Sequence, residues 1–188
     1  LWSTLEWTLM QPTRIDVSSS SHTYPVFIAH GLIPELQALL SEVGVGPRRF
    51  VISSPNVWKR HGDVVTGALP GIKHLLVSDG ERSKTHQTLG RIYEWLIRNG
   101  ADRQSTIIAV GGGVIGDTVG FAAATFLRGI ALVHVPTTLL AQVDSAVGGK
   151  VGVNHILGKN LIGAFHPPVA VIADPEILDT LPRRELRA

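Results

Sequence analysis

The chain has 188 residues, of which 44% are hydrophobic and 17% are charged, a balance that suits one well-packed domain and argues against disorder. Its formal net charge is +2 and its 17 basic residues form no run, which favours small anionic ligands over nucleic acid. Cysteine is absent, so disulfides, thiolate metal ligands and a thiol nucleophile are excluded, and we expect a cytoplasmic location. We find no apolar run that spans a membrane and no signal-like basic N-terminus.

Two spacings of apolar residues alternate along the chain. Short apolar, β-branched runs predict strands, and apolar residues three and four positions apart predict helices. Strands are expected at residues 14–17, 24–28, 50–52, 75–77, 106–110, 130–135 and 169–173. Helices are expected at 32–43 with Gly44 as the cap, near 56–68 after Ser53-Ser54-Pro55, and along a face from Leu89 to Leu96 that ends near Gly100. The alternation predicts the α/β class, with a Rossmann-like, mostly parallel sheet and flanking helices.

A glycine turn follows the expected strand at 106–110. Residues 111–117 read Gly-Gly-Gly-Val-Ile-Gly-Asp, which matches G-x-G-x-x-G at the point where a strand turns into a helix. Glycine lets the backbone approach a pyrophosphate, whose charge is favoured by the free N–H groups of the helix N-terminus. The alternative is that the glycines serve only a tight turn. The carboxylate that such a motif expects about 20 residues later is missing, because residues 133–137 contain none.

An acidic turn at residues 79–84, Asp-Gly-Glu-Arg-Ser-Lys, follows the strand at 75–77. Its position after the carboxyl end of a strand places Glu81 on the same sheet edge as the glycine turn, where open α/β sheets bind ligands. A carboxylate here can accept hydrogen bonds from ribose. The same residues also suit a helix start at Lys84, with Ser83 or Thr85 as the cap.

A second group of polar residues follows Pro136. Two of the five lysines, Lys150 and Lys159, lie between glycines, which we interpret as turns suited to gripping an anion. Thr137-Thr138, Asp144 and Asn160 fall in the same stretch. This combination predicts a polyhydroxylated, phosphorylated ligand, and the alternative is a long polar surface loop. The eight histidines show no metal-ligand spacing, and neither a nucleophile elbow nor a P-loop is present.

Together these residues resemble the 3-dehydroquinate synthase family, within the wider group of sugar-phosphate cyclases. The resemblance covers residues 79–187. Its motifs are the two turns above, Gly120-Phe121, Arg128-Gly129, Pro136 to Ala141, Val143-Asp144-Ser145, Gly148-Gly149-Lys150, Gly158-Lys159-Asn160, and Thr180-Leu181-Pro182 with Arg184-Glu185-Leu186.

The resemblance implies an NAD-dependent enzyme, usually a homodimer with zinc or cobalt, that converts a seven-carbon keto-acid phosphate (DAHP) into 3-dehydroquinate and phosphate in the shikimate pathway. It implies transient oxidation of a substrate hydroxyl, elimination of phosphate, re-reduction and ring closure. The residues that it assigns to NAD are Asp79, Gly80, Glu81, Arg82, Ser83, Lys84, Gly113, Val114, Ile115, Gly116, Asp117, Thr137, Thr138, Lys150, Lys159, Ile177, Leu178, Asp179 and Thr180.

The resemblance also assigns substrate residues. It places Asp144, Lys150 and Asn160 beside the substrate, and it lets Arg128 reach the phosphate across a dimer interface. Where the family has Asp or Asn after its first Rossmann-like strand, this chain has Ser54, which puts one ribose contact in doubt.

The family's metal ligands lie further along its sequence than Ala188. We therefore expect no metal ligand in this chain, an NAD-binding domain at residues 1–175, and in 176–188 the start of a connection to a C-terminal helical metal-binding domain. On this interpretation the chain is a fragment that is inactive alone.

Three other functions stay open. One is another cyclase, of the 2-epi-5-epi-valiolone or 2-deoxy-scyllo-inosose synthase type. Another is a metal-dependent polyol dehydrogenase, which forms NADH in net amounts. The third is a non-catalytic nucleotide-binding module, against which the Lys150 and Lys159 group argues.

Overall fold

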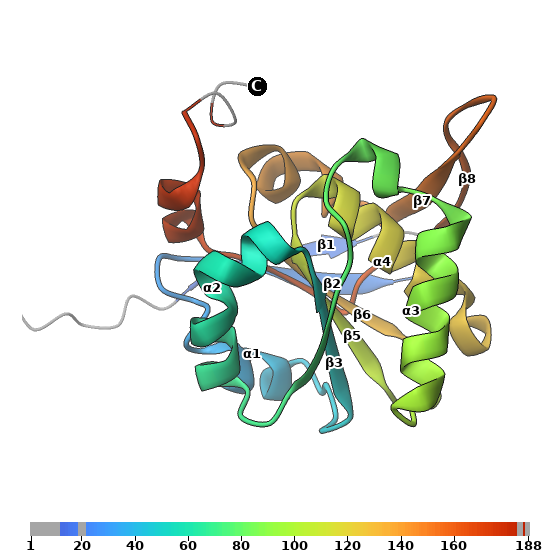
Figure 1. Cartoon of the computed structure of the whole chain (residues 1–188). Coiled ribbons are helices and arrows are strands. Elements are labelled where there is room, and N and C mark those ends of the chain that lie inside the picture. Colours follow the sequence, from blue (N-terminus) through green and yellow to red (C-terminus); the bar gives the residue numbers. More distant parts are fainter. Residues whose placement is uncertain (1–11, 19–21, 184–185, 187–188) are drawn as a thin grey trace, which may run out of the picture.

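A computed structural model describes residues 12–18, 22–183 and 186. Its centre is a seven-stranded sheet with the order β1-β2-β9-β6-β5-β3-β4 (Figure 1). Only β1 and β2 pair in antiparallel fashion, and every other neighbouring pair is parallel. The strands are β1 (Thr13–Ser18), β2 (Thr23–Ile28), β3 (Arg49–Ser53), β4 (Lys73–Leu76), β5 (Thr106–Gly111), β6 (Ala131–Pro136) and β9 (Ala170–Ala173). The predicted α/β class and mostly parallel sheet are confirmed.

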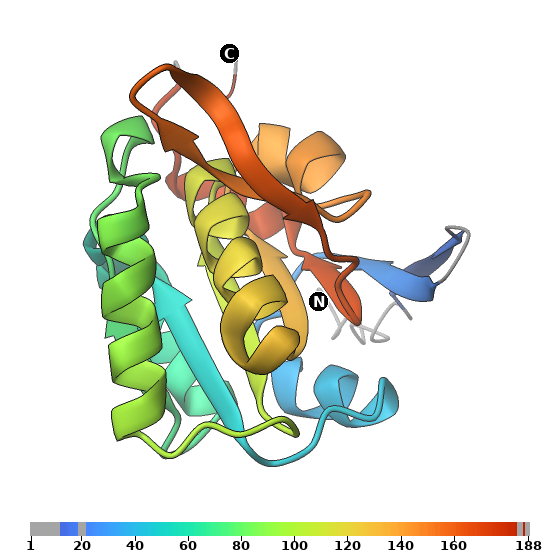
Figure 2. The same ribbon diagram turned by 90° about the vertical axis from the view of Figure 1, so that its right-hand side faces the viewer.

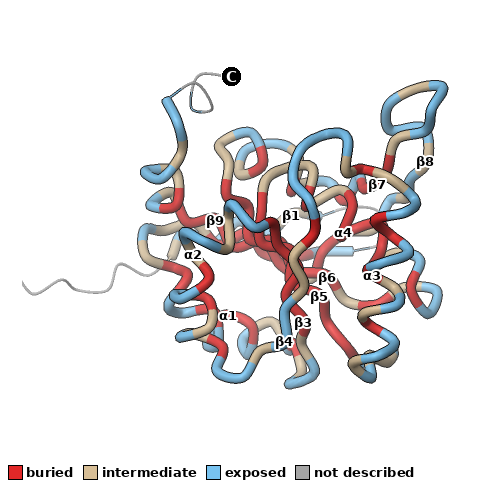
Figure 3. The backbone as a smooth tube through the Cα atoms, viewed as in Figure 1, coloured by how far each residue is buried: buried red, intermediate tan, exposed pale blue. Residues whose placement is uncertain are grey.

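Helices cover both faces of the sheet. One apolar cluster joins it to α1 (Leu36–Glu42) and α2 (Pro55–Ala68), and another joins it to α3 (His86–Arg98) and α4 (Gly113–Thr125). The central strands are therefore buried on both sides (Figure 3), as the continuous apolar runs predict. The first helix begins later than expected, at Leu36. The third begins at His86, with the Thr85 hydroxyl accepting a hydrogen bond from the Thr88 N–H as the cap.

The order of connections reverses between β3 and β5. From β3 the chain passes through α2 to β4 on one side, whereas from β5 it passes through α4 to β6 on the other. The helices diverge there, so a crevice opens at the carboxyl ends of these two strands, where open α/β sheets bind ligands. The loops after β3, β4, β5 and β6 all reach this edge. The predicted acidic and glycine turns are two of them.

A two-stranded antiparallel hairpin, β7 (Lys150–His155) and β8 (Gly158–Phe165), lies across α4 (Figure 2). A Cβ at Gly120 of α4 would lie 2.4 Å from Val151 Cγ1, so this glycine lets the hairpin approach the helix. Sequence patterns did not predict the hairpin. The expectation that Lys150 and Lys159 sit inside turns is wrong, because they are the first residue of β7 and the second of β8.

Short turns complete the chain at the sheet's ends. They are η1 (Glu81–Ser83), η2 (Phe126–Arg128), η3 (Ala141–Ser145) and η4 (Pro175–Thr180). Within the described residues, no helix has the length and apolar character needed to cross a membrane. The residues 1–10, and Arg184 and Glu185 of the last motif, lie outside the described part of the chain.

Candidate functional site

The glycine turn joins β5 to α4, and its residues Gly111, Gly112 and Gly113 contribute no side chain of their own at the start of the helix. Gly112 occupies the N-cap position, no side chain caps the helix, and the first backbone bond runs from Gly116 N to Gly112 O at 3.0 Å. A Cβ at Gly112 would lie 3.0 Å from Thr138 Cγ2, and one at Gly113 would lie 3.0 Å from Ser145 Oγ. The uncapped N–H groups and the positive end of the helix dipole are therefore chemically suited to an anion.

A cavity of about 640 Å³ lies at the switch point in front of this turn. Both predicted turns and both threonines contribute to it, which brings together residues from four loops. The predicted residues that line it are Asp79, Gly80, Gly113, Val114, Thr137, Thr138 and Thr180. The start of α2 adds Asn56, Val57, Arg60 and His61, which sequence analysis missed. The signal was available, because Ser54-Pro55 starts a helix at the same sheet edge.

Ser54 connects this cavity to the acidic turn. It is fully buried at the N-cap of α2, where its hydroxyl accepts a hydrogen bond from Val57 N at 3.4 Å. The same hydroxyl donates to Asp79 Oδ2 at 3.0 Å, and Gly80 N donates to Asp79 Oδ1 at 2.8 Å. Ser54, which is shorter than the Asp or Asn of the family at this position, therefore orients the Asp79 carboxylate at the wall of the cavity.

We expect Ser54→Ala to lower the free energy of unfolding by about 1 kcal/mol, because an N-cap is lost, and to weaken NAD binding several-fold. Urea unfolding and calorimetric titration measure the two effects. Thr85→Ala is the matched control, since Thr85 caps α3 and does not contact Asp79. It should lose similar stability and keep its NAD affinity. Equal NAD affinity in the two variants would contradict the role given to Ser54.

Lys84 is buried at the centre of a polar cluster that is itself only partly buried. Its Nζ donates to Asp117 Oδ2 at 2.7 Å and to Asn160 Oδ1 at 2.5 Å, and its side chain is only 4% exposed. Burial raises the pKa of Asp117, the Lys84 hydrogen bond and charge oppose this shift, and the Glu81 charge adds to it. The ion pair thus favours the charged form of the Asp117 carboxyl group in a place where burial disfavours it.

A second cavity, of about 540 Å³, lies between α4, η3 and the hairpin. Asp117, Asp144, Lys150 and Asn160 all line it, together with Ser145. It therefore brings three of the four predicted catalytic residues, Asp144, Lys150 and Asn160, together with Asp117 of α4. Asp117 and Asn160 also contact Lys84, so this cavity and the acidic turn share one cluster.

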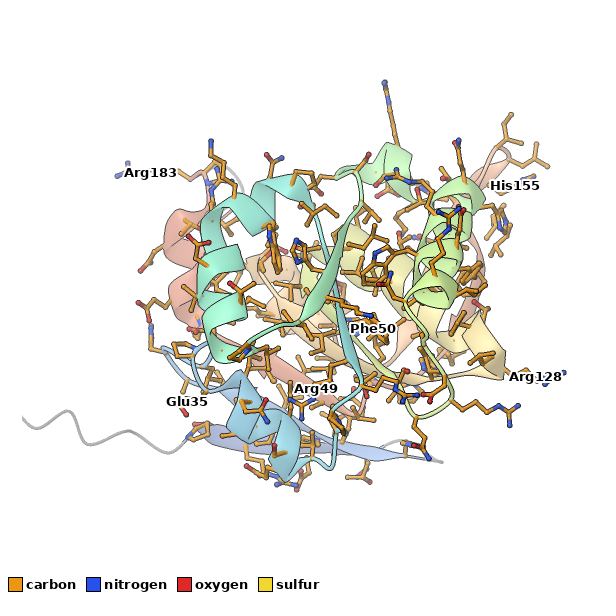
Figure 4. The ribbon with its side chains drawn as sticks, turned by 60° about the horizontal axis from the view of Figure 1, so that its bottom comes forward. Glu35, Arg49, Phe50, Arg128, His155 and Arg183 are labelled. Carbon is orange, nitrogen blue, oxygen red and sulfur yellow. The ribbon has the colours of Figure 1, made fainter. Side chains whose placement is uncertain are left out.

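Other predicted residues lie away from both cavities. Arg128 is exposed at the end of α4 opposite the glycine turn, and Figure 4 shows it pointing out from the molecule. The 13 residues of α4 separate the two ends by roughly 20 Å at 1.5 Å per residue. Lys159, Leu178 and Asp179 line neither cavity. Ile177 packs into the core.

Four more predicted residues lie behind or beside the cavities. Ile115 is buried beneath the glycine turn, so only its backbone can face a ligand. Arg82 is exposed and Ser83 donates its hydroxyl to Gly80 O at 2.6 Å. Gly116 leaves space for His134, whose Cε1 would lie 3.4 Å from a Cβ there. These residues shape the turns more than they line the cavities.

His134 is buried on β6, behind the first turn of α4. Burial lowers the pKa of His134 to about 4, with a further contribution from the His166 charge. An unfolded histidine binds a proton below about pH 6.5, so between pH 6.5 and 4 the unfolded state binds more protons than the folded state. The contribution of neutral, buried His134 to the free energy of unfolding is therefore fully present above that window and is lost as the pH falls through it.

We expect the free energy of unfolding to fall by about 2 kcal/mol between pH 7.5 and pH 5 on account of His134. Urea unfolding at the two pH values measures this. In His134→Phe the drop should shrink by that amount, whatever the variant's stability at pH 7.5. His86→Gln, at an exposed position, is the control and should keep the drop. An unchanged drop in His134→Phe would show that another group causes it.

Fold and site together define a Rossmann-like α/β domain with a ligand crevice at its switch point. The family model for the N-terminal part of 3-dehydroquinate synthase matches residues 74–188. The chain is 49% identical over 178 residues to the 3-dehydroquinate synthase of Neisseria meningitidis serogroup C, a match that covers 93% of this chain and 49% of that protein. The chain belongs to the 3-dehydroquinate synthase family, and it spans about half the length of the curated relatives it matches.

Solved structures of related cyclases have the same fold. A 2-deoxy-scyllo-inosose synthase in complex with carbaglucose-6-phosphate, NAD⁺ and Co²⁺ matches with a TM-score of 0.83 and 32% identity, over 92% of this chain and 49% of that one. The 2-epi-5-epi-valiolone synthase of Streptomyces hygroscopicus subsp. jinggangensis, with NAD⁺ and Zn²⁺ bound, matches with a TM-score of 0.80 and 30% identity, over 91% and 48%.

Proposed function

We propose that this chain is the cofactor-binding half of a cytoplasmic 3-dehydroquinate synthase, a lyase that converts DAHP into 3-dehydroquinate and phosphate. The observation that carries the proposal is the meeting of two cavities. One has an uncapped helix N-terminus, and the other gathers Asp144, Lys150 and Asn160. Lys84 of the acidic turn, whose Asp79 and Gly80 line the first cavity, pairs with Asp117, which lines the second. The 49% identity to a protein of that name supports it further.

The first cavity fits a dinucleotide. The side-chain-free glycine turn suits a pyrophosphate, and the Asp79 carboxylate, held by Ser54, suits ribose hydroxyls. NAD, when bound, accepts a hydride from the substrate and returns it. In this proposal residues 1–175 form the NAD-binding domain, and residues 176–188 lead toward the half of the protein that the relatives have in addition. Thr180 then closes the cavity at its edge.

The second cavity fits a phosphorylated hydroxy acid. The Lys150 ammonium group and the Asn160 amide donate hydrogen bonds to anionic oxygens, and the Asp144 carboxylate accepts them from hydroxyls. Arg128 points away from this cavity. In this proposal, as the family resemblance implies, the chain is part of a homodimer in which Arg128 of the partner subunit binds the phosphate. This placement agrees with its exposure at the far end of α4.

We assign no metal-binding role to the described residues. Among the described residues, no group of three His, Asp or Glu side chains lies close enough together to hold a metal ion. The related cyclase structures contain Co²⁺ or Zn²⁺. The described residues do not supply such a site, so we derive no step through a metal, and we expect the 188-residue chain to release no phosphate from DAHP with zinc and NAD added.

Calorimetric titration of the 188-residue chain tests the proposal. NAD should bind first, and a phosphonate analogue of DAHP should then bind to the NAD complex more tightly than carbaglucose-6-phosphate does. Tighter binding of carbaglucose-6-phosphate would instead favour a 2-deoxy-scyllo-inosose synthase, the function of the structural relative. Absence of NAD binding would overturn the proposal.

A further inference from the structure

We propose that Asn154 is a positioning residue that couples the two cavities, by tying the acidic turn of the cofactor site to Asn160 of the substrate site. The inference rests on the function proposed above. Nothing in the sequence motifs singles out Asn154, and it lines neither cavity. Its hydrogen bonds carry the proposal.

Asn154 bonds to three residues in two segments at once. Its side-chain Nδ2 donates to Glu81 Oε1 at 2.7 Å, and its Oδ1 accepts from Asn160 N at 2.8 Å. Its backbone N donates to Lys84 O at 2.9 Å. One residue of the hairpin therefore holds both ends of the Glu81–Lys84 turn and the backbone of Asn160, which lines the second cavity.

A register shift in the hairpin frees Asn154 for these contacts. Val153 pairs with Ile162 and His155 pairs with Gly158, with the irregularity between them. Asn154 lies at that irregularity, outside the regular pairing, so its N–H is available to Lys84 O. Irregularities of this kind re-aim a residue beside many active sites.

The contacts close into a ring through Lys84. The Lys84 Nζ donates to Asn160 Oδ1, while Asn154 holds the Asn160 N–H. Asn160 has a φ of +55°, a left-handed conformation that costs energy for a residue with a side chain. Two bonds to opposite ends of Asn160 hold it there. Since its Oδ1 is occupied by Lys84, its Nδ2 is the group left to donate to a ligand in the second cavity.

The chemistry of the ring requires an amide at position 154. The group must donate to a carboxylate on one side and accept from an N–H on the other, and an amide does both. Aspartate has no donor, so Asn154→Asp sets a second carboxylate against Glu81. A ligand that fixes the acidic turn through Asp79 and Gly80, which line the first cavity, also orders Asn160 through Glu81 and Asn154. In this way occupation of one cavity would raise affinity in the other.

The test is a swap of donor and acceptor in the 188-residue chain. Calorimetry gives the affinity of the DAHP phosphonate with and without saturating NAD, and the ratio is the coupling factor. We expect about a tenfold factor in the unmodified chain, within the usual range for coupled sites, and a factor near one in Asn154→Asp. The double variant Glu81→Gln with Asn154→Asp restores a donor facing an acceptor and should recover most of the coupling.

Two controls separate positioning from general damage. Gln104→Glu adds the same charge at an exposed position before the amino end of β5 and should keep the coupling factor. Asn154→Ser retains the backbone bond without the full bridge, so it should lose most of the coupling even if Asn154→Asp fails to fold. Wild-type coupling in either Asn154 variant overturns the inference. Absence of NAD binding in the unmodified chain overturns the proposed function itself, which is a different result.

Discussion

Lys84→Met is expected to destabilise the chain by about 3 kcal/mol and to reduce NAD binding more than tenfold. Methionine fills a similar volume but leaves the Asp117 carboxylate, 23% exposed, without its charged partner, and breaking a buried pair costs about 3–5 kcal/mol. The partial exposure of Asp117 places the expected loss at the lower end. Asn160 loses the bond to its side chain at the same time. Urea unfolding and NAD titration measure the two losses.

The pH dependence of this loss identifies its cause. Burial already raises the pKa of Asp117 against the opposing influence of Lys84, so removing the lysine raises it further. A carboxyl group whose pKa is raised in the folded state destabilises the fold as the pH rises through that pKa. The deficit of Lys84→Met relative to the unmodified chain should therefore shrink from pH 7.5 to pH 5. The comparison at equal pH cancels the His134 effect.

Two further variants frame this result. Lys73→Met removes a lysine at an exposed strand position and should change the free energy of unfolding by no more than about 0.5 kcal/mol. Adding Asp117→Asn to Lys84→Met removes the unpaired charge and should recover about half of the loss. A Lys84→Met protein with a pH-independent deficit would show that packing, rather than the charge of Asp117, dominates at this position.

The strand and helix pattern was predictable because the central strands are buried on both faces. All six residues of β5 are buried, so burial alone required a continuous apolar run. The polar turns followed from the same logic, since parallel strands bring their carboxyl ends to one edge. Hence Asp79, Gly113 and Thr137 were expected together and line one cavity.

The hairpin was not predictable because glycines and polar residues break its pattern. Gly152 and Gly163 face each other across the strands, and a Cβ on either would approach the opposite backbone to 2.6 or 2.3 Å. That requirement comes from a neighbouring strand and leaves no periodic signal. Asn154 was missed for the same reason, since its partners at Glu81 and Lys84 lie at least 70 residues away, counted as 154 − 84.

The roles of Ser54 and α2 were also tertiary effects. A serine before a proline is typical of a helix start, and Ser54 is indeed the N-cap of α2. Its second hydrogen bond, to Asp79 after the neighbouring strand, could not be predicted from that pattern. The sequence pattern marked Ser54 only as a departure from the family. In the structure the departure has a physical consequence, because the short hydroxyl orients a carboxylate that a longer acidic side chain at position 54 would repel.

Gly149→Ala is expected to lose about 3–4 kcal/mol of unfolding free energy and at least tenfold in affinity for the DAHP phosphonate. Gly149 has a φ of +69°, which costs alanine about 1–2 kcal/mol. The added Cβ would also lie 2.7 Å from Pro167 N and 2.9 Å from His166 C. Because these are backbone atoms, the turn must move away, and overpacking of this kind costs about 1–3 kcal/mol. Lys150 follows directly, so it moves with the turn.

Gly148→Ala supplies a control that differs in one respect. Gly148 also has a left-handed conformation, with a φ of +88°, but nothing lies within 4 Å of a Cβ there. Both variants therefore lose stability because alanine must adopt a left-handed conformation. Only Gly149→Ala adds a steric clash with the backbone of residues 166 and 167. We expect Gly148→Ala to lose about 1 kcal/mol and to retain its affinity for the phosphonate. Similar losses of stability and affinity in the two variants would mean that residues 166 and 167 can move at little cost. The packing of Gly149 against them would then not hold Lys150 in place.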